Sequence, residues 1–179
     1  MGECRRKSLG PPKLAPARPL SAPYSSCQLR IDSGDYPLFA PLVIANQAGL
    51  GDDEGFSMFG TAQSPPALHH STPSFTSAPL IELRAADFTP LTDLVTDGGT
   101  FGYLIADGSE NFAGSHLTAL RAAQDGLRIE LLTPGSTLEY ITSANSGRYG
   151  ISVMGPLEHL FDSEVSFSGN TAIDLRDPG

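Results

Sequence analysis

Closely spaced turn signals in the second half of the chain constrain the fold more than any other sequence feature. From Pro79 onward, pairs such as Asp-Gly, Pro-Gly and Gly-Asn interrupt the sequence at short and fairly regular intervals. Between them lie short runs rich in β-branched and aromatic residues, for example FGYLIA, LRIELL and RYGISVM. Short strands separated by closely spaced turn signals are typical of all-β domains. We therefore predict a mainly-β fold, an antiparallel sandwich or jelly-roll-like domain.

Charge divides the chain into an N-terminal arm and a body. Residues 1–30 contain six basic residues and one acid, whereas the remainder contains five arginines, no lysine and 19 acids. Residues 1–28 also carry five prolines, which predicts an extended arm that is flexible or bound to a partner. Residues 29–179 are predicted to form a single β-rich domain. Its acidity disfavours nucleic acid as a ligand, except through contact with the basic arm.

Two segments early in the body depart from the regular pattern. Residues 29–45 include an apolar stretch interrupted by Pro37 and Pro41, which favours an edge strand or an extended segment because central strands exclude proline. Residues 55–79 contain no charged side chain but several phenylalanines, which predicts a long uncharged loop. Such a loop suits packing on the domain's own core or on a neighbouring subunit.

One segment has the spacing of a helix rather than of a strand. His116, Leu117, Leu120 and Ala123 recur at helical intervals. Ser115 stands at the position of an N-cap, and Asp125-Gly126 supplies a stop. The sequence therefore predicts one short helix over about residues 115–125, inserted between strands.

The segment 127–142 predicts an antiparallel hairpin around a Pro-Gly turn. An even register pairs Leu131 with Leu138 and places Glu130 directly opposite Glu139. No internal repeat is convincing. The alternating residues on the predicted strands define a core, which comprises Phe101, Tyr103, Ile105, Leu127, Ile129, Leu131, Leu138, Tyr140, Ile151 and Val153.

The body lacks the recognisable motifs of catalysis and cofactor binding. It contains no G-x-S-x-G, GxGxxG or phosphate-binding GxxxxGK[ST] motif, and no cysteine or lysine follows residue 30. The remaining candidates are a histidine with nearby carboxylates and the two glutamates of the hairpin. These site candidates are His159, Glu158, Asp162, Glu164, Glu130 and Glu139. We expect no metal and no cofactor.

The sequence carries no signal for a membrane. No apolar run approaches the ~18 residues that a spanning helix needs. The N-terminus lacks the apolar region of a secretory signal, so we expect a soluble protein of unspecified location. Residues 1–28 remain open to three interpretations: a targeting peptide, an assembly arm or an over-extended start.

Three functions are compatible with these features. The first is a non-catalytic structural or interaction subunit of a larger assembly, such as a virus-like particle shell or decoration protein, with protein partners or self-association. The second is a small-ligand or carbohydrate-binding β module, against which the absence of tryptophan counts. The third is an enzyme whose His159 and neighbouring acids form a site without a recognisable motif. The arm and the absence of catalytic motifs favour the first.

Overall fold

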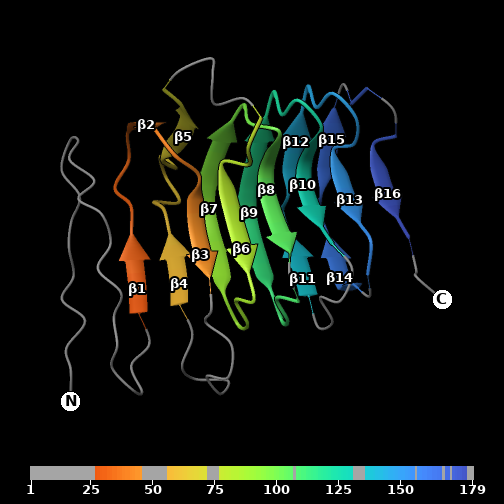
Figure 1. Cartoon of the computed structure of the whole chain (residues 1–179), viewed down its shortest axis with the longest axis horizontal. Coiled ribbons are helices and arrows are strands. Elements are labelled where there is room, and N and C mark those ends of the chain that lie inside the picture. The colour runs from red at the N-terminus through yellow and green to blue at the C-terminus, as the bar shows by residue number, and fades with distance from the viewer. Residues whose placement is uncertain are drawn as a thin grey trace.

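The protein folds as a parallel β-solenoid, in which the chain winds around one axis and stacks strand upon strand (Figure 1). The structure is a computed structural model that describes residues 27–45, 56–71, 77–106, 108–130, 136–155, 157–166, 168–169 and 171–176. Within these ranges there is no helix, and every strand pair is parallel. The predicted antiparallel β-sandwich or jelly roll is therefore wrong.

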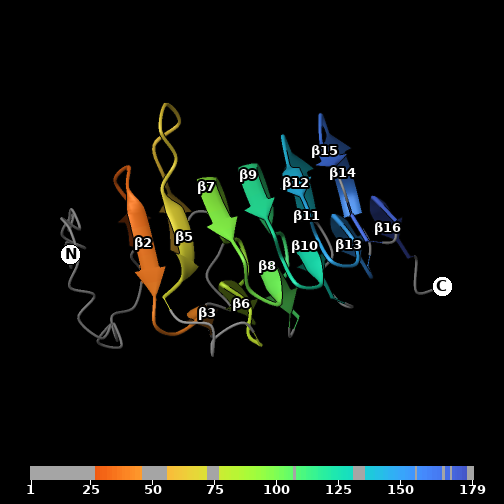
Figure 2. The same ribbon diagram turned by 90° about the horizontal axis from the view of Figure 1, so that it is seen from above.

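The strands form two sheets, and the larger sheet has two columns (Figure 2). The first column of the 10-stranded sheet consists of β1 (Cys27–Arg30), β4 (Phe56–Phe59), β7 (Pro90–Asp97), β9 (Ala113–Leu120), β11 (Ser136–Glu139) and β14 (Leu157–Phe161). The second column consists of β2 (Asp35–Leu38), β5 (Ala67–His70), the distal halves of β7 and β9, β12 (Thr142–Ala144) and β15 (Glu164–Ser166). The 6-stranded sheet consists of β3 (Leu42–Ala45), β6 (Ile81–Arg84), β8 (Phe101–Ala106), β10 (Asp125–Ile129), β13 (Ile151–Val153) and β16 (Ile173–Leu175).

The core lies between the two sheets and is built from in-register rows of apolar side chains. One row contains Tyr103, Leu127 and Ile151, and the next contains Ile105, Ile129 and Val153. Successive rungs of a solenoid bury the same strand position, so each side chain packs on its equivalents above and below.

Most of the predicted core is confirmed. Seven of the ten residues are buried: Tyr103, Ile105, Leu127, Ile129, Leu138, Ile151 and Val153. Phe101 is only half-buried, and Tyr140 is 47% exposed. Leu131 lies outside the described residues.

The larger sheet bends between its columns at one residue per rung. The bend residues of the last four rungs have left-handed backbone with φ between 41° and 55°, and they are Asp93, His116, Tyr140 and Asp162. The bend breaks strand alternation, so that in β9 the inward residues are Gly114, Leu117 and Ala119, spaced by three and then two. A spacing of three imitates a helical period. The helix predicted over 115–125 is therefore wrong, since β9 and the start of β10 occupy that segment.

A column of glycines lets the two sheets approach closely at one side of the core. Gly102, Gly126 and Gly150 each precede a residue of the Tyr103 row, and they face small side chains of the second column. A Cβ on Gly126 would lie 2.7 Å from the Gly150 carbonyl oxygen and 2.9 Å from the Ser143 Cβ. Both separations are shorter than a van der Waals contact, so the inter-sheet distance here requires glycine.

The tyrosine of the core is anchored by its hydroxyl. The Tyr103 O–H group lies 2.8 Å from the Leu94 carbonyl oxygen and 3.2 Å from that of Thr118. Full burial raises the pKa of Tyr103 far above its usual range, because the phenolate would lose its hydration. The neutral tyrosine therefore connects the smaller sheet to the larger sheet through hydrogen bonds across the interior.

The early segments of the body also contribute strands. The uncharged stretch 55–79 contains β4 and β5, which pair within the larger sheet. The apolar stretch in residues 29–45, predicted to be an edge strand or an extended segment, forms two strands in different sheets, β2 and β3, and each pairs on one side only among the described residues. The predicted arm falls outside the described residues up to position 26. The described part of the chain contains no helix that is long and apolar enough to cross a membrane.

Candidate interaction surface

The last described rung, β14 to β16, has a neighbouring rung on one side only among the described residues. Among the described residues, β16 pairs only with β13, and β14 and β15 pair only with β11 and β12. The Ile151 N–H bonds the Ala172 carbonyl, and the Arg176 N–H bonds that of Val153. Ala172, Asp174 and Arg176 therefore point their backbone groups at β13. The backbone groups of Ile173 and Leu175 in β16 point away from the stack, where a further strand can pair.

The side chains of this rung are less covered than their equivalents inside the solenoid. Leu160, Val165 and Ile173 pack against the core but are only partly buried. Phe161 and Leu175 are 50% and 57% exposed. Exposed apolar side chains beside unpaired strand edges are a common mark of protein contact surfaces.

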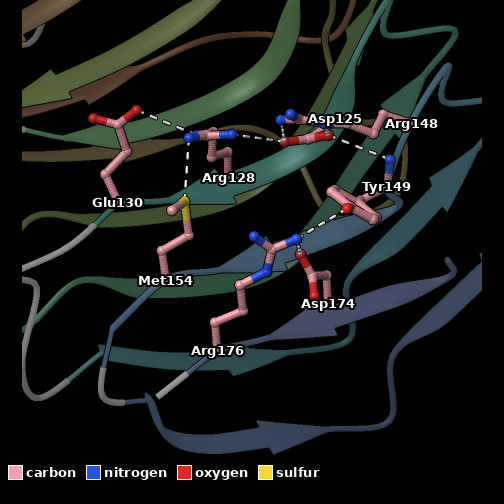
Figure 3. A network of polar contacts seen from close by, with 8 residues as sticks. All are labelled: Asp125, Arg128, Glu130, Arg148, Tyr149, Met154, Asp174 and Arg176. Atoms are coloured by element: carbon pink, nitrogen blue, oxygen red, sulfur yellow. Dashed lines mark hydrogen bonds and ion pairs between the residues drawn. The ribbon is translucent and has the colours of Figure 1, made fainter. Parts of the chain in front are cut away.

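A network of polar contacts on the outer face of the smaller sheet fixes the charged side chains of β16 (Figure 3). The Arg176 Nη2 atom lies 2.8 Å from the Asp174 carboxylate and donates to the Tyr149 hydroxyl at 3.0 Å. The hydrogen bond to Asp174 raises the pKa of Arg176. Asp174 and Arg176 are thus held two residues apart on the same face of the edge strand.

The base of this network is a buried carboxylate. The Asp125 side chain is fully buried, and Arg148 binds it through two bonds of 2.8 and 2.5 Å. Arg128 lies 3.4 Å from the same carboxylate, and the Tyr149 backbone N–H donates to it at 3.3 Å. The hydrogen bond from Arg148 to Asp125 raises the pKa of that arginine. Buried charge is tolerated here because two arginines and a backbone donor compensate it.

The network lines a shallow depression of about 80 Å³, but its charges are already paired. Three of the five arginines that follow Arg30 line this depression, namely Arg128, Arg148 and Arg176. Asp125, Glu130 and Asp174 neutralise them. The polar network therefore connects the last rungs to the rest of the solenoid and orients the Asp174 and Arg176 side chains.

The opposite end of the solenoid has a different edge. In β2, the carbonyl groups of Gly34 and Leu38 accept hydrogen bonds from β5, so Asp35 and Pro37 face away from the stack. Proline has no N–H group, which makes this edge a poor template for a further strand. Asp35 is 2.8 Å from His69 in the neighbouring rung.

The predicted glutamate pair does not exist. Glu130 follows β10 of the smaller sheet, whereas Glu139 ends β11 of the larger sheet. Glu139 is flanked in register by Ser115 and Phe161, and Glu130 accepts a hydrogen bond from Arg128 at 3.2 Å. The predicted hairpin is wrong because β10 and β11 belong to different sheets and do not pair with each other.

The histidine–carboxylate candidates lie on the last rung. His159 and Glu158 belong to β14, but their side chains are outside the described residues. Asp162 occupies the bend and Glu164 begins β15, and both are exposed. The described residues contain no group of three or more potential metal ligands among His, Cys, Asp and Glu.

A polar contact at the bend of the larger sheet has no recognisable signal in the sequence pattern. The Ser115 Oγ atom lies 2.9 Å from His116 Nδ1, and the His116 ring stacks on Tyr140 with centroids 4.6 Å apart. The contact depends on the bend, where His116 and Tyr140 both have positive φ. The stack links consecutive rungs on the surface.

Comparisons with known proteins identify no relative. No protein-family model matches the chain, and neither the curated proteins nor the solved structures include a significant match. The surfaces described above are therefore the basis on which a function can be assigned.

Proposed function

We propose that the protein is a non-catalytic structural or interaction subunit that assembles with copies of itself through its last rung. The observation that carries this proposal is the combination of outward-pointing backbone groups and exposed apolar side chains on β14 to β16. Leu175 shows both features, because its backbone faces away from β13 and its side chain is 57% exposed. A strand from a second copy would satisfy these groups, as in other complexes formed by strand addition.

The polar contacts of the described residues support a scaffolding role. The Arg148–Asp125 and Arg176–Tyr149 contacts connect residues far apart in the sequence, and Tyr103 spans the interior. These contacts hold neighbouring rungs together and fix the charged side chains beside the edge strand. Side chains that are already held in place lose less conformational entropy on association.

The proposal predicts that proline at position 175 blocks assembly. The Leu175 N–H points away from β13, so Leu175→Pro removes no hydrogen bond inside the chain, just as Pro37 removes none from β2. A buried carbonyl left without its donor costs roughly 1–3 kcal/mol. We therefore expect the dissociation constant to rise by about tenfold or more. Native mass spectrometry or light scattering over a concentration series measures this change.

Leu175→Val is the matched control, since it keeps the N–H group and an apolar side chain. We expect the unmodified chain and Leu175→Val to assemble, and Leu175→Pro to shift toward the 18.8 kDa single chain. A purified chain that stays at 18.8 kDa at every concentration would contradict the proposal. Equal assembly of the proline and valine variants would show that the contact lies elsewhere.

A further inference from the structure

We infer that two copies pair last rung to last rung, as a closed two-fold dimer, and do not stack head to tail into a filament. This inference rests on the proposed function and specifies its geometry. The described strands leave two edges, one at each end of the stack, so self-association can join unlike ends or like ends. Joining unlike ends propagates without limit, whereas joining like ends closes after two copies.

Head-to-tail stacking would continue the existing register but leaves one hydrogen bond unmade. The register of the second column places Val165 beside Tyr36 of the next copy. Glu164 and Ser166 direct their backbone groups at β12, so Val165 directs its groups outward. In a parallel ladder, the Val165 carbonyl would need the N–H of residue 37 in the next copy. Residue 37 is proline, which has none.

Head-to-tail stacking also brings like charges together. The same register places Glu164 directly opposite Asp35 of the next copy. Both residues are exposed acids on the outer face. Like charges in directly opposed strand positions destabilise a pair. Two independent features of β2 therefore disfavour the unlike-end contact.

Pairing like ends makes β16 complementary to itself. An antiparallel pair centred on Leu175 faces Leu175 of one copy with Leu175 of the other, and their outward backbone groups exchange hydrogen bonds. The same register sets Asp174 opposite Arg176 of the second copy, and Arg176 opposite Asp174. Shifting the centre to Asp174 or to Arg176 would instead oppose two identical charges. Charge complementarity therefore selects the register centred on Leu175.

The side chains required for this pairing are already in place. Asp174 of β16 and Arg176, which directly follows β16, lie on one face, held by their mutual contact at 2.8 Å and by Tyr149. A two-fold axis perpendicular to the smaller sheet keeps the larger sheets of both copies on the same side. The partly buried Leu160 and Val165 of one copy then come near those of the other.

A single cysteine substitution tests the geometry. In a background with Cys4 and Cys27 replaced by serine, Leu175→Cys places two thiols opposite each other only in the like-end dimer. Hydrogen-bonded antiparallel pairs have Cα atoms about 5.5 Å apart, within the range that a disulfide bridges. Val43→Cys is the matched control, because Val43 is a 45% exposed apolar residue on the edge strand β3 at the other end. Mild oxidation is followed by a non-reducing gel, and native mass is measured for the same background without either new cysteine.

We expect a native mass twice that of the chain, with Leu175→Cys captured mostly as a disulfide-linked pair and Val43→Cys mostly as single chains. A doubled or higher native mass without cross-linking of Leu175→Cys would overturn the like-end geometry and leave the proposed function standing. Equal cross-linking of both variants would overturn it as well. A native mass of a single chain would overturn both the geometry and the proposed function.

Discussion

Replacing Gly126 with valine is expected to lower the free energy of unfolding by about 3 kcal/mol or more, at the upper end of overpacking costs. A Cβ at this position would meet the Gly150 carbonyl oxygen at 2.7 Å and the Ser143 Cβ at 2.9 Å, and the Ser143 Oγ closer still. Backbone atoms on one side and the opposite sheet on the other leave no space for relaxation. Valine is a better strand former than glycine, so any loss of stability must come from these contacts.

Chemical denaturation of the purified variant measures this loss. Thr142→Val on β12 is the control, since Thr142 is half-buried on the outer face and a surface change of this kind has only a small effect on stability. In the Gly126→Ala variant, adding Ser143→Gly should recover part of the stability, because it removes one of the two contacts. An unchanged midpoint for Gly126→Val would show that the sheets do not approach at this glycine.

Ile129→Ala is expected to cost about 2–5 kcal/mol, the range observed for large-to-small changes in a packed core. Ile129 is fully buried and lies in register between Ile105 and Val153. Removing its side chain interrupts a continuous apolar row, so both neighbours lose contacts at once. The cavity is enclosed by strands on both sides and has little freedom to collapse.

Thermal and urea unfolding with circular dichroism check this value. Val43→Ala supplies the comparison, because Val43 faces outward on an edge strand of the same sheet and its truncation should change the free energy of unfolding very little. A negligible loss for Ile129→Ala would mean that this face of β10 is not buried. Equally large losses in the two variants would indicate general destabilisation of the sheet instead of a packed row.

Strand content and much of the core could be predicted from composition and alternation, but strand direction could not. Leu127 and Ile129 alternate with Arg128 whether β10 pairs with a parallel or an antiparallel neighbour. Alternation indicates which face of a strand is buried, but it does not indicate which strand pairs with it or in which direction. The Pro-Gly sequence near residue 134 is typical of a hairpin turn. It therefore predicted that the flanking strands pair with each other, whereas they belong to different sheets.

The repeat that distinguishes a solenoid is present in the sequence but weak. Three glycines recur at one constant interval, namely Gly102, Gly126 and Gly150. The first and third residues after each glycine are apolar, and the residue between them varies. Only the glycine is identical in all three copies. The first rung is longer, because the interval from Leu42 to its register partner Ile81 exceeds the interval between successive glycines. The turn pairs of the sequence do not follow this pattern, since the feature that the rungs share is the inter-sheet spacing and not a turn.

The interaction surface could not be inferred without the fold. Asp174 and Arg176 are ordinary surface charges in the sequence, and only the parallel stack places them on a terminal strand. Pro37 is the exception, because proline in a strand predicted an edge and β2 is one. The prediction that Glu130 and Glu139 form a pair depended on the hairpin. Their strands lie in different sheets, so the two glutamates are not paired.

Two double-cysteine variants test the parallel stacking on which the whole account depends. In a background lacking Cys4 and Cys27, one variant joins Ser115→Cys with Glu139→Cys, which are register neighbours on β9 and β11. Adjacent strands lie about 4.8 Å apart, so this pair should oxidise readily within one chain. The other joins Glu130→Cys with Glu139→Cys, which lie in different sheets and should remain reduced. A disulfide between positions 130 and 139, with 115 and 139 left reduced, would contradict the solenoid and favour the hairpin.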